Sequence, residues 1–226
     1  GIQSLIEADG LSERRMTSTT VAFGICPRIN AAGRMGSADR AIRLLLSEDY
    51  EEANALAQEI NDENATRQQT EQEILNQAVA QIKNNPNWIY QNVLVVAGEG
   101  WHDGVVGIVA SRLVEKYGKP TLVITVDGDD AKGSGRSIDG FNLYDALSHC
   151  GECLTHFGGH MLAAGIGLKT ENIGTFRKAI NEYADSIEMP FPIQTVDFKL
   201  NPAYVNVEML SAIEQLEPFG AGNPQP

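Results

Sequence analysis

The sequence has few of the residues from which disulfide frameworks, metal sites and membrane spans are made. Its 226 residues include only three cysteines and four histidines, and aromatic residues make up 7%. An odd and sparse cysteine count excludes a disulfide framework and fits a reducing cytoplasm, which is the localisation we expect. Apolar runs such as Val93–Ala97 are far shorter than the roughly 20 residues that a membrane-spanning helix needs. We therefore expect no membrane partner.

Positive charge is also scarce. Lysine and arginine total 17 against 30 aspartates and glutamates, which gives a formal net charge of −13. This balance argues against a protein that holds nucleic acid by bulk electrostatic attraction. It leaves open a narrow line of basic side chains on an acidic body. The hydrophobic content of 42% is typical of a globular protein with a real core.

Clustered metal ligands are lacking too. Hydrolysis by two metal ions needs several carboxylates and imidazoles around ions about 4 Å apart, and the sequence has no Asp-His-His cluster. The acids of Asp127–Asp130 have no histidine nearby in sequence and are more simply a solvated turn. Cys150 and Cys153 form a C-x-x-C flanked by His149 and His156. That arrangement makes a metal site conceivable, but ordinary helix-terminal cysteines are the simpler interpretation. We assign no metal ligand to this chain.

Residues 1–86 show helical spacing of apolar side chains. The pattern predicts helices over 38–46 and 51–83, with Ser47 or Asp49 as the N-cap of the second. That second helix is polar on most faces, which is typical of a helix that bridges domains.

Residues 87–187 change to an α/β pattern. The apolar run Val93–Ala97, a helical face over 105–117 and a second strand over 121–126 predict a right-handed parallel crossover. Asp103 is the candidate N-cap of this helix, and Gly118 ends it. Further elements follow in order: a hairpin strand at 131–137, a helix at 143–149, a strand at 163–168 and a helix at 173–187. The expected fold is an α/β domain with a mixed, mainly parallel sheet flanked by helices.

Residues 188–226 form a third region. Thr195–Leu200 alternates like a strand, and Val207–Leu216 has helical spacing. Phe219–Pro226 is a glycine-containing and proline-containing loop. We expect both chain ends to be boundaries within a longer protein.

Four segments could carry chemistry, and the first two contain arginine. In Pro27–Gly36, Arg28, Asn30 and Arg34 stand among small residues, so the segment is either a phosphate-binding loop or a loop whose arginines are solvated or paired with acids. In the second segment, exposed amides with a guanidinium could form an anion-binding nest, or the segment could be a tight hairpin. The residues concerned there are Ser134, Arg136 and Ser137.

The other two segments contain histidine. Gly158 and Gly159 precede His160, so backbone amides and an imidazole could meet a phosphate, or the segment could be a glycine turn with a structural histidine. Trp101 and His102 lie where a predicted strand leads into a helix, a usual ligand position in open α/β sheets. Trp101 could stack on a base or anchor the core.

These segments resemble known motifs. The stretch from Gly158 to Gly165, with its Gly-Gly-His-x-x-Ala-Ala-Gly pattern, resembles the signature of the DHHA1 domain, which accompanies the DHH domain in a superfamily of metal-dependent phosphodiesterases. The segments Pro27–Gly36, Gly98–Arg112 and Gly133–Ser137 resemble RecJ-type single-strand-specific exonucleases. Four ordered motifs across nearly the whole chain make coincidence improbable.

The resemblance implies a division of labour. In that family a DHH domain binds Mn²⁺ or Mg²⁺ and cleaves, a long helix joins it to the DHHA1 domain, and an oligonucleotide-binding barrel follows. The chain would then comprise a helical region and connector (1–86), the DHHA1 domain (87–187) and the start of the barrel region (188–226). The metal would be held outside this sequence, and no cofactor is expected within it.

The resemblance also implies roles for residues and partners. His160 is the candidate catalytic residue. The candidate substrate-binding residues are Arg28, Asn30, Arg34, Trp101, His102, Ser134, Arg136, Ser137, Gly158 and Gly159. The intact protein would digest single-stranded DNA from a 5′ end during repair and recombination, with a single-strand-binding protein and a helicase as candidate partners. Two alternatives stay open: a short-oligonucleotide or cyclic-dinucleotide phosphodiesterase of the same superfamily, and a non-catalytic nucleic-acid-binding scaffold.

Overall fold

The computed structural model describes residues 1–226 except 14, 192, 194, 195, 197, 198, 221 and 226. The chain divides into two compact units. One contains Gly1–Thr66 and Ile193–Pro226, and the other contains Arg67–Pro192. The long helix α5 (Tyr50–Asn84) contributes its first part to one unit and the remainder to the other. The three domain ranges expected from the sequence remain a prediction.

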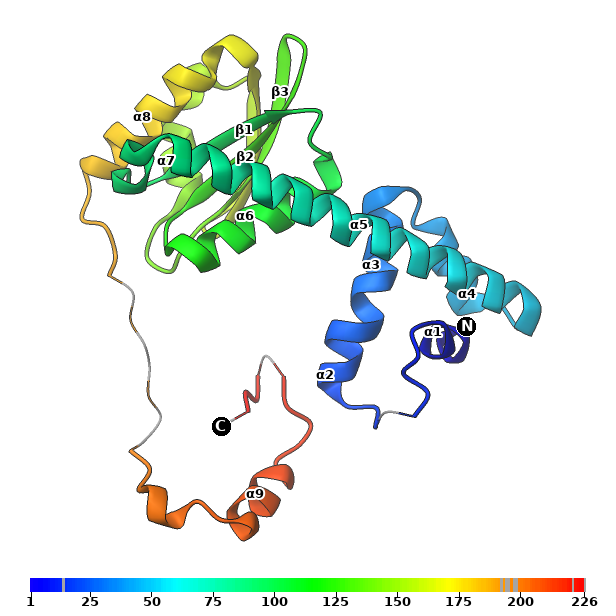
Figure 1. Ribbon diagram of the computed structural model, residues 1–226. Coiled ribbons are helices and arrows are strands. Elements are labelled where there is room, and N and C mark those ends of the chain that lie inside the picture. Colours follow the sequence, from blue (N-terminus) through cyan, green and yellow to red (C-terminus); the bar gives the residue numbers. More distant parts are fainter. Residues whose placement is uncertain (14, 192, 194–195, 197–198, 221, 226) are drawn as a thin grey trace. The chain divides into compact units, whose positions relative to one another are not determined.

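The first unit is built from helices around a small apolar core. Its centre contains Leu5, Leu44 and Ile60, whose side chains are fully buried. The helices before α5 are α1 (Ile2–Ala8), α2 (Ser18–Thr20), α3 (Cys26–Met35) and α4 (Asp39–Leu46) (Figure 1).

The segment expected as a loop at Pro27–Gly36 is mostly helical, because it forms α3. The preceding turn, Val21–Ile25, is a π-helical segment in which the Cys26 amide donates to the Val21 carbonyl. Pro27 has no amide hydrogen to continue the regular bonding pattern, and a wide turn is a common way to accommodate such a residue. Sequence reasoning missed this helix because its glycines and proline are typical of loops.

Helix α5 confirms the long helix predicted over 51–83. Its 35 residues begin beyond Asp49, whose carboxylate accepts the amides of Glu51 and Glu52, so this N-cap prediction is confirmed. Ile74, Ala78 and Ile82 follow at helical spacing and are buried in the second unit. The rest of the helix is largely polar, as expected.

The second unit contains a five-stranded sheet with the order β1-β2-β3-β5-β4. The strands are β1 (Leu94–Glu99), β2 (Thr121–Asp127), β3 (Asp130–Arg136), β4 (His156–His160) and β5 (Ala163–Lys169). Helix α6 (Asp103–Tyr117) connects β1 to the parallel strand β2, whereas all other pairs are antiparallel. The sheet is mixed, as expected, but the expectation of mainly parallel pairing is wrong, because short connections follow β2 and β4.

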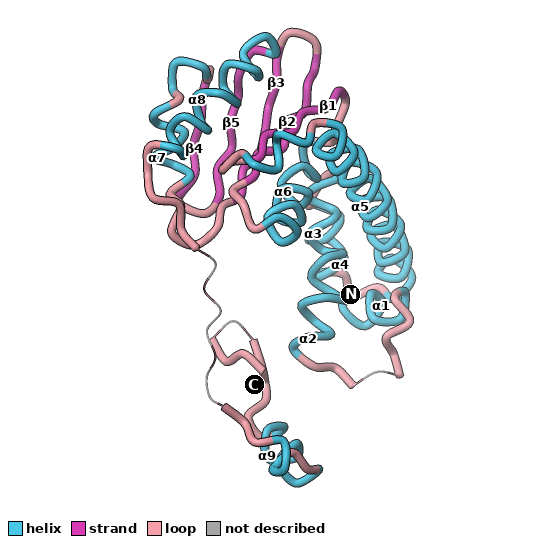
Figure 2. The backbone as a smooth tube through the Cα atoms, turned by 60° about the vertical axis from the view of Figure 1, so that its left-hand side comes forward, coloured by secondary structure: helices cyan, strands magenta, loops and turns pink. Residues whose placement is uncertain are grey.

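Helices cover both faces of this sheet (Figure 2). Helix α6 and the second part of α5 lie on one face, and α7 (Leu143–His149) and α8 (Ile173–Asp185) lie on the other. The α7–α8 side holds a core cluster with Leu122, Phe141 and Phe176 fully buried. These helices confirm the predictions for 105–117, 143–149 and 173–187.

The remaining elements are short. They are η2 (Pro86–Tyr90), η3 (Gly151–Cys153), η4 (Thr170–Asn172), η5 (Pro202–Tyr204) and α9 (Val207–Glu214). Helix α9 confirms the helix expected at 207–216. The strand expected at Thr195–Leu200 lies largely outside the described residues. Within the described part of the chain, no helix combines the length and apolar character needed to cross a membrane.

Candidate nucleic-acid interface

Strand β3 presents a row of polar side chains on the sheet face that carries α6. Because side chains alternate along a strand, Lys132, Ser134 and Arg136 share that face. A Cβ built on Gly107 of α6 would lie 3.2 Å from the Arg136 guanidinium and 3.5 Å from Ser134 Oγ. Gly107 therefore lets α6 approach these two side chains closely.

The segment Gly133–Ser137 does not form the anion-binding nest considered above. Most of it is regular strand, because β3 pairs with β2 on one side and with β5 on the other. Its backbone groups are thus used within the sheet. What this strand offers a ligand is its side chains, and the Arg136 guanidinium also donates to the Gly135 carbonyl at 2.8 Å.

The strand register brings the second and third motifs to one surface. Arg136 pairs with Ala163 of β5, which pairs in turn with His160 of β4. Two strand spacings separate the backbones of Arg136 and His160, or about 10 Å. In the next row, Ser134, Gly165 and Gly158 are aligned in the same way. Ala163 and Gly165 of β5 thus separate the arginine from the histidine with side chains no larger than a methyl group, and we call this part of β5 the floor of the interface.

His160 is exposed at the end of β4, and its ring orientation is set locally. The amide of Leu162 donates to His160 Nδ1 at 3.3 Å. In the neutral imidazole the proton therefore resides on Nε2, which can donate a hydrogen bond to an oxygen of a ligand. This geometry supports a hydrogen-bonding role for His160 without establishing a proton transfer.

Gly158 and Gly159 belong to an edge strand, which differs from the turn considered from the sequence. A Cβ on Gly158 would meet no atom within 4 Å, so this residue faces open space. Gly159 has φ +147°, and a Cβ there would collide with the backbone of Ala163. Among the described strands β4 has one neighbour, so alternate amides on its outer side point away from the sheet.

Ser137 has a structural partner. Its hydroxyl donates to the Phe141 carbonyl at 2.8 Å, and its amide donates to the Leu162 carbonyl. These bonds hold the connection after β3 against the one that follows β4. The Ser137 hydroxyl proton is used in the bond to Phe141, so a phosphate contact would compete with that bond.

Trp101 lies in the core, so the geometry favours the second of its two interpretations. The residue is 5% exposed, its indole N–H donates to Gln77 of α5 at 2.7 Å, and a Cβ on Gly98 would overlap its ring. Little of the ring remains for base stacking. His102 is the N-cap of α6 through its Nδ1, which accepts the amide of Gly104 at 3.1 Å. The prediction of Asp103 as this cap is wrong by one residue.

A cavity of about 330 Å³ lies beside Trp101 at the carboxyl ends of β1 and β2. This is the usual ligand position in such sheets. However, most of its charged lining is acidic. The charged residues are Glu99, Asp103, Asp127, Asp130 and Lys132. Such a lining disfavours a phosphate, so this cavity is a poor candidate for DNA.

The arginine-containing segment of the helical unit has two parts with different surroundings. Arg28 forms an ion pair with Asp9 and donates to Asn61 at 2.9 Å and to the Gly24 carbonyl at 2.7 Å. Its guanidinium thus stabilises the unit internally. Asn30 and Arg34 are exposed and lie one helical turn apart on α3. Because α3 and β3 belong to different units, convergence of Arg34 with Arg136 and His160 remains a prediction.

The residues present do not fit a catalytic metal. Within the described ranges, no three residues among histidine, cysteine, aspartate and glutamate form a metal-binding group. Cys150 is buried, and this burial raises the pKa of its thiol to about 11.

Sequence reasoning missed three polar residues that lie next to these motifs: Thr125, Lys132 and His156. Two signals could have identified Lys132, namely its position two residues before Ser134 and the alternation of a strand. Nothing in the sequence placed His156 opposite Lys132, because the pairing of β4 with β5 had not been predicted.

Known proteins share this architecture. Residues 85–186 match the DHHA1 domain family. Over 100% of its length the chain is 41% identical to the single-stranded-DNA-specific exonuclease RecJ of Bacillus subtilis (strain 168) and 31% identical to that of Escherichia coli (strain K12). The chain covers 29% and 41% of these two relatives, so it spans well under half of their length.

A solved structure agrees with these relatives. The crystal structure of RecJ from Thermus thermophilus in complex with Mn²⁺ matches 100% of the chain with a TM-score of 0.86 and 33% identity, and the match covers 33% of that protein. The same fold and the same family are therefore found by sequence and by structure. This chain belongs to the RecJ family, and residues 85–186 are its DHHA1 domain.

Proposed function

We propose that this chain is the strand-gripping part of a single-stranded-DNA-specific exonuclease that digests from the 5′ end. The observation that carries the proposal is the row that places Arg136 and His160 on one sheet face, on either side of the small residues of β5. A guanidinium on one side and an imidazole N–H on the other suit the oxygens of one backbone phosphate. The named activity of the relatives supports the choice of DNA as the substrate.

Hydrolysis itself belongs to a DHH domain outside this sequence, with Mn²⁺ or Mg²⁺ as its ion. Support comes from the Mn²⁺ complex of the related RecJ and from the lack of a metal-binding group in the described part of this chain. When bound, such ions polarise the phosphodiester and activate water. The residues of this chain would hold and orient the strand. A single-strand-binding protein and a helicase remain candidate partners.

A single substitution tests the gripping role. In the intact protein, Arg136→Met should weaken binding of single-stranded DNA by about 1.5–3 kcal/mol, because one charged contact to phosphate is lost. Arg43→Met is the control, since Arg43 is an arginine in an exposed ion pair with Glu52 in the helical unit. Equal affinities of the Arg136 variant and the wild type would reject the assignment.

Substrate length and metal removal separate the alternatives. The proposal expects cleavage of a long single strand to exceed that of a dinucleotide, and a chelator to stop cleavage until Mn²⁺ or Mg²⁺ is restored. Preferred cleavage of the dinucleotide would indicate the short-oligonucleotide alternative. Strand binding without any metal-dependent cleavage by the intact protein would indicate a scaffold.

A further inference from the structure

A second cavity lies on the same sheet face, next to the Arg136–His160 row. Its volume is about 210 Å³. It is lined by Asp103, Val106, Thr125, Lys132, Gly133, Ser134, His156, Gly165 and Ile166. All of these residues belong to the second unit. The cavity therefore shares Ser134 and Gly165 with the candidate interface and extends it along the strands.

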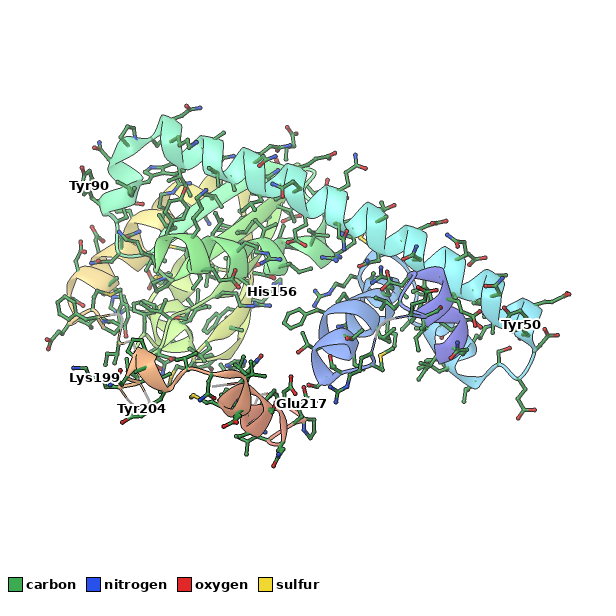
Figure 3. The ribbon with its side chains drawn as sticks, turned by 60° about the horizontal axis from the view of Figure 1, so that its bottom comes forward. Tyr50, Tyr90, His156, Lys199, Tyr204 and Glu217 are labelled. Atoms are coloured by element: carbon green, nitrogen blue, oxygen red, sulfur yellow. The ribbon has the colours of Figure 1, made fainter. Side chains whose placement is uncertain are left out.

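Lys132 and His156 both line this cavity. Both pair with Gly167 of β5, so the three residues form a row parallel to that of Arg136 and His160. The imidazole of His156 lies over Gly167, where a Cβ would overlap the ring. Figure 3 labels the position of His156 on β4. His156 is exposed, and the side chain of Lys132 is 69% exposed. The row thus repeats the pattern of a cation on β3, a small residue on β5 and a histidine on β4.

Hydroxyl groups complete the lining. Thr125 pairs with Lys132 across β2 and β3, is 6% exposed and lines the cavity. Ser134 also lines the cavity with its hydroxyl-bearing side chain. A hydroxyl can donate to an oxygen of a ligand or accept from one, so these side chains add polar groups to the lining. Together these groups supply a charge and several donors for an anion.

The neighbouring acids limit the extent of such a site. Lys132 also borders the larger acidic cavity, with Asp103 at 3.7 Å and with Asp127 and Asp130 in the same lining. The Lys132–Asp103 pair is long and exposed, so opening it costs little. The acids beyond it repel phosphate, so an anionic chain would extend from Lys132 towards Arg136 rather than past β2.

We propose that the Lys132–His156 cavity is a second subsite for a backbone phosphate of the same DNA strand. Lys132 and Arg136 are four residues apart on β3, which corresponds to about 13 Å along the strand. A single strand lying along β3 and β4 would thus place one phosphate at each row, with more than one nucleotide step between them. This subsite rests on the proposed function, because the first row must hold DNA for the second to extend it.

The test uses the intact protein, a chelator that prevents cleavage, and oligothymidylates of two lengths. A dinucleotide can occupy one row, whereas an octanucleotide reaches both. The double variant Lys132→Met with His156→Gln should bind the octanucleotide about tenfold more weakly, because a charged contact is lost, and bind the dinucleotide as the wild type does. Its salt slope for the octanucleotide should fall by about 0.7, the value for one phosphate on a single strand.

The chain offers matched controls. Lys178 is an exposed lysine on α8 that pairs with Glu182 at 3.6 Å, much as Lys132 pairs with Asp103. His149 is exposed on α7 and contacts the Tyr183 ring. The double variant Lys178→Met with His149→Gln should change neither affinity. Lys132→Arg keeps the charge and should retain octanucleotide binding.

The outcomes separate this subsite from the proposed function. Arg136→Met should weaken both oligonucleotides, and its failure to do so would overturn the first row. If Arg136→Met weakens both but the Lys132–His156 variant changes neither, the second subsite alone is rejected. Equal weakening of both lengths by the Lys132–His156 variant would also reject it, because the two rows would then act as one site. If inorganic phosphate binds at the Lys132–His156 row but the Lys132–His156 variant binds the octanucleotide as the wild type does, the site takes a free anion and not the strand.

Discussion

Two glycines near the candidate interface, Gly159 and Gly165, differ in the space available for the methyl group of an alanine substitution. Gly159 has φ +147°, and a Cβ there would collide with the Ala163 carbonyl, whereas the nearest atom to a Cβ on Gly165 is the Gly133 carbonyl at 4.0 Å. We therefore expect Gly159→Ala to lower the free energy of unfolding by roughly 2–4 kcal/mol. Gly165→Ala should change it by less than about 1 kcal/mol. Urea unfolding of the two variants measures the difference.

The same pair separates folding from binding at the floor of the interface. Gly165 is exposed between Ser134 and Gly158, so its methyl group would project into the space assigned to the strand. Gly165→Ala should thus weaken DNA binding while stability is retained. Normal binding by a folded Gly165→Ala protein would contradict a close approach of the strand to β5.

Residue types suggested a phosphate-binding role for this surface, but they could not identify all the residues that line it. The sequence identified Arg136, Ser134 and His160 as phosphate-binding candidates, and the structure aligns them on one face. It could not identify the Lys132–His156 row, because cross-strand register depends on pairing between distant segments. Nor could it decide whether Trp101 stacks on a base, since that depends on the space that Gly98 and Gln77 provide in the core.

Helix packing in the first unit depends on one ion pair more than on its exposed charges. The side chains of Arg28 and Asp9 are 14% and 13% exposed, so removing one partner leaves the other nearly buried and unpaired. Arg28→Ala should lower the free energy of unfolding by about 2–4 kcal/mol. Arg43→Ala breaks the exposed pair with Glu52 and should cost less than about 1 kcal/mol. Chemical denaturation of both variants checks the contrast.

The structural role of Arg28 makes it a poor residue with which to test DNA binding. Weaker DNA binding by Arg28→Ala would reflect a damaged helical unit as readily as a lost phosphate contact. Arg34→Met is the better probe of that segment, because Arg34 is exposed on α3. Equal unfolding energies of the Arg28 and Arg43 variants would show that the Asp9 pair has no structural importance.

At the scale of elements, apolar periodicity predicted most of the fold. It identified α5, α6, α7, α8 and the strands β1 and β2 close to their observed bounds. The turn at Asp127–Asp130 and the small residues of 163–168 added β3 and β5. It missed α3 and β4, whose composition is typical of turns. Tertiary pairing overrides local preference in both cases: β4 is held along β5, and α3 contributes the fully buried Ala31 and Ala32. Both missed elements carry candidate DNA contacts.

The whole chain combines an acidic body with few cations at the candidate interface. Its formal net charge is −13, and the cations assigned to strand contact are Arg34, Lys132 and Arg136. An acidic surface repels duplex and single strand alike, so affinity must come from local contacts. Such an arrangement holds the DNA strand through individual short-range contacts and provides little long-range electrostatic attraction.

This charge distribution predicts weak binding by the chain alone with a shallow dependence on salt. For a single strand the slope of log K against log salt is about −0.7 for each phosphate, so contacts with three phosphates give at most about −2. Titration of residues 1–226 with oligothymidylate over a range of salt concentrations measures this slope. Lys132→Met and Arg136→Met should each make it shallower by about 0.7, whereas Lys178→Met should leave it unchanged. Tight duplex binding that persists in high salt would contradict a narrow phosphate track on an acidic protein.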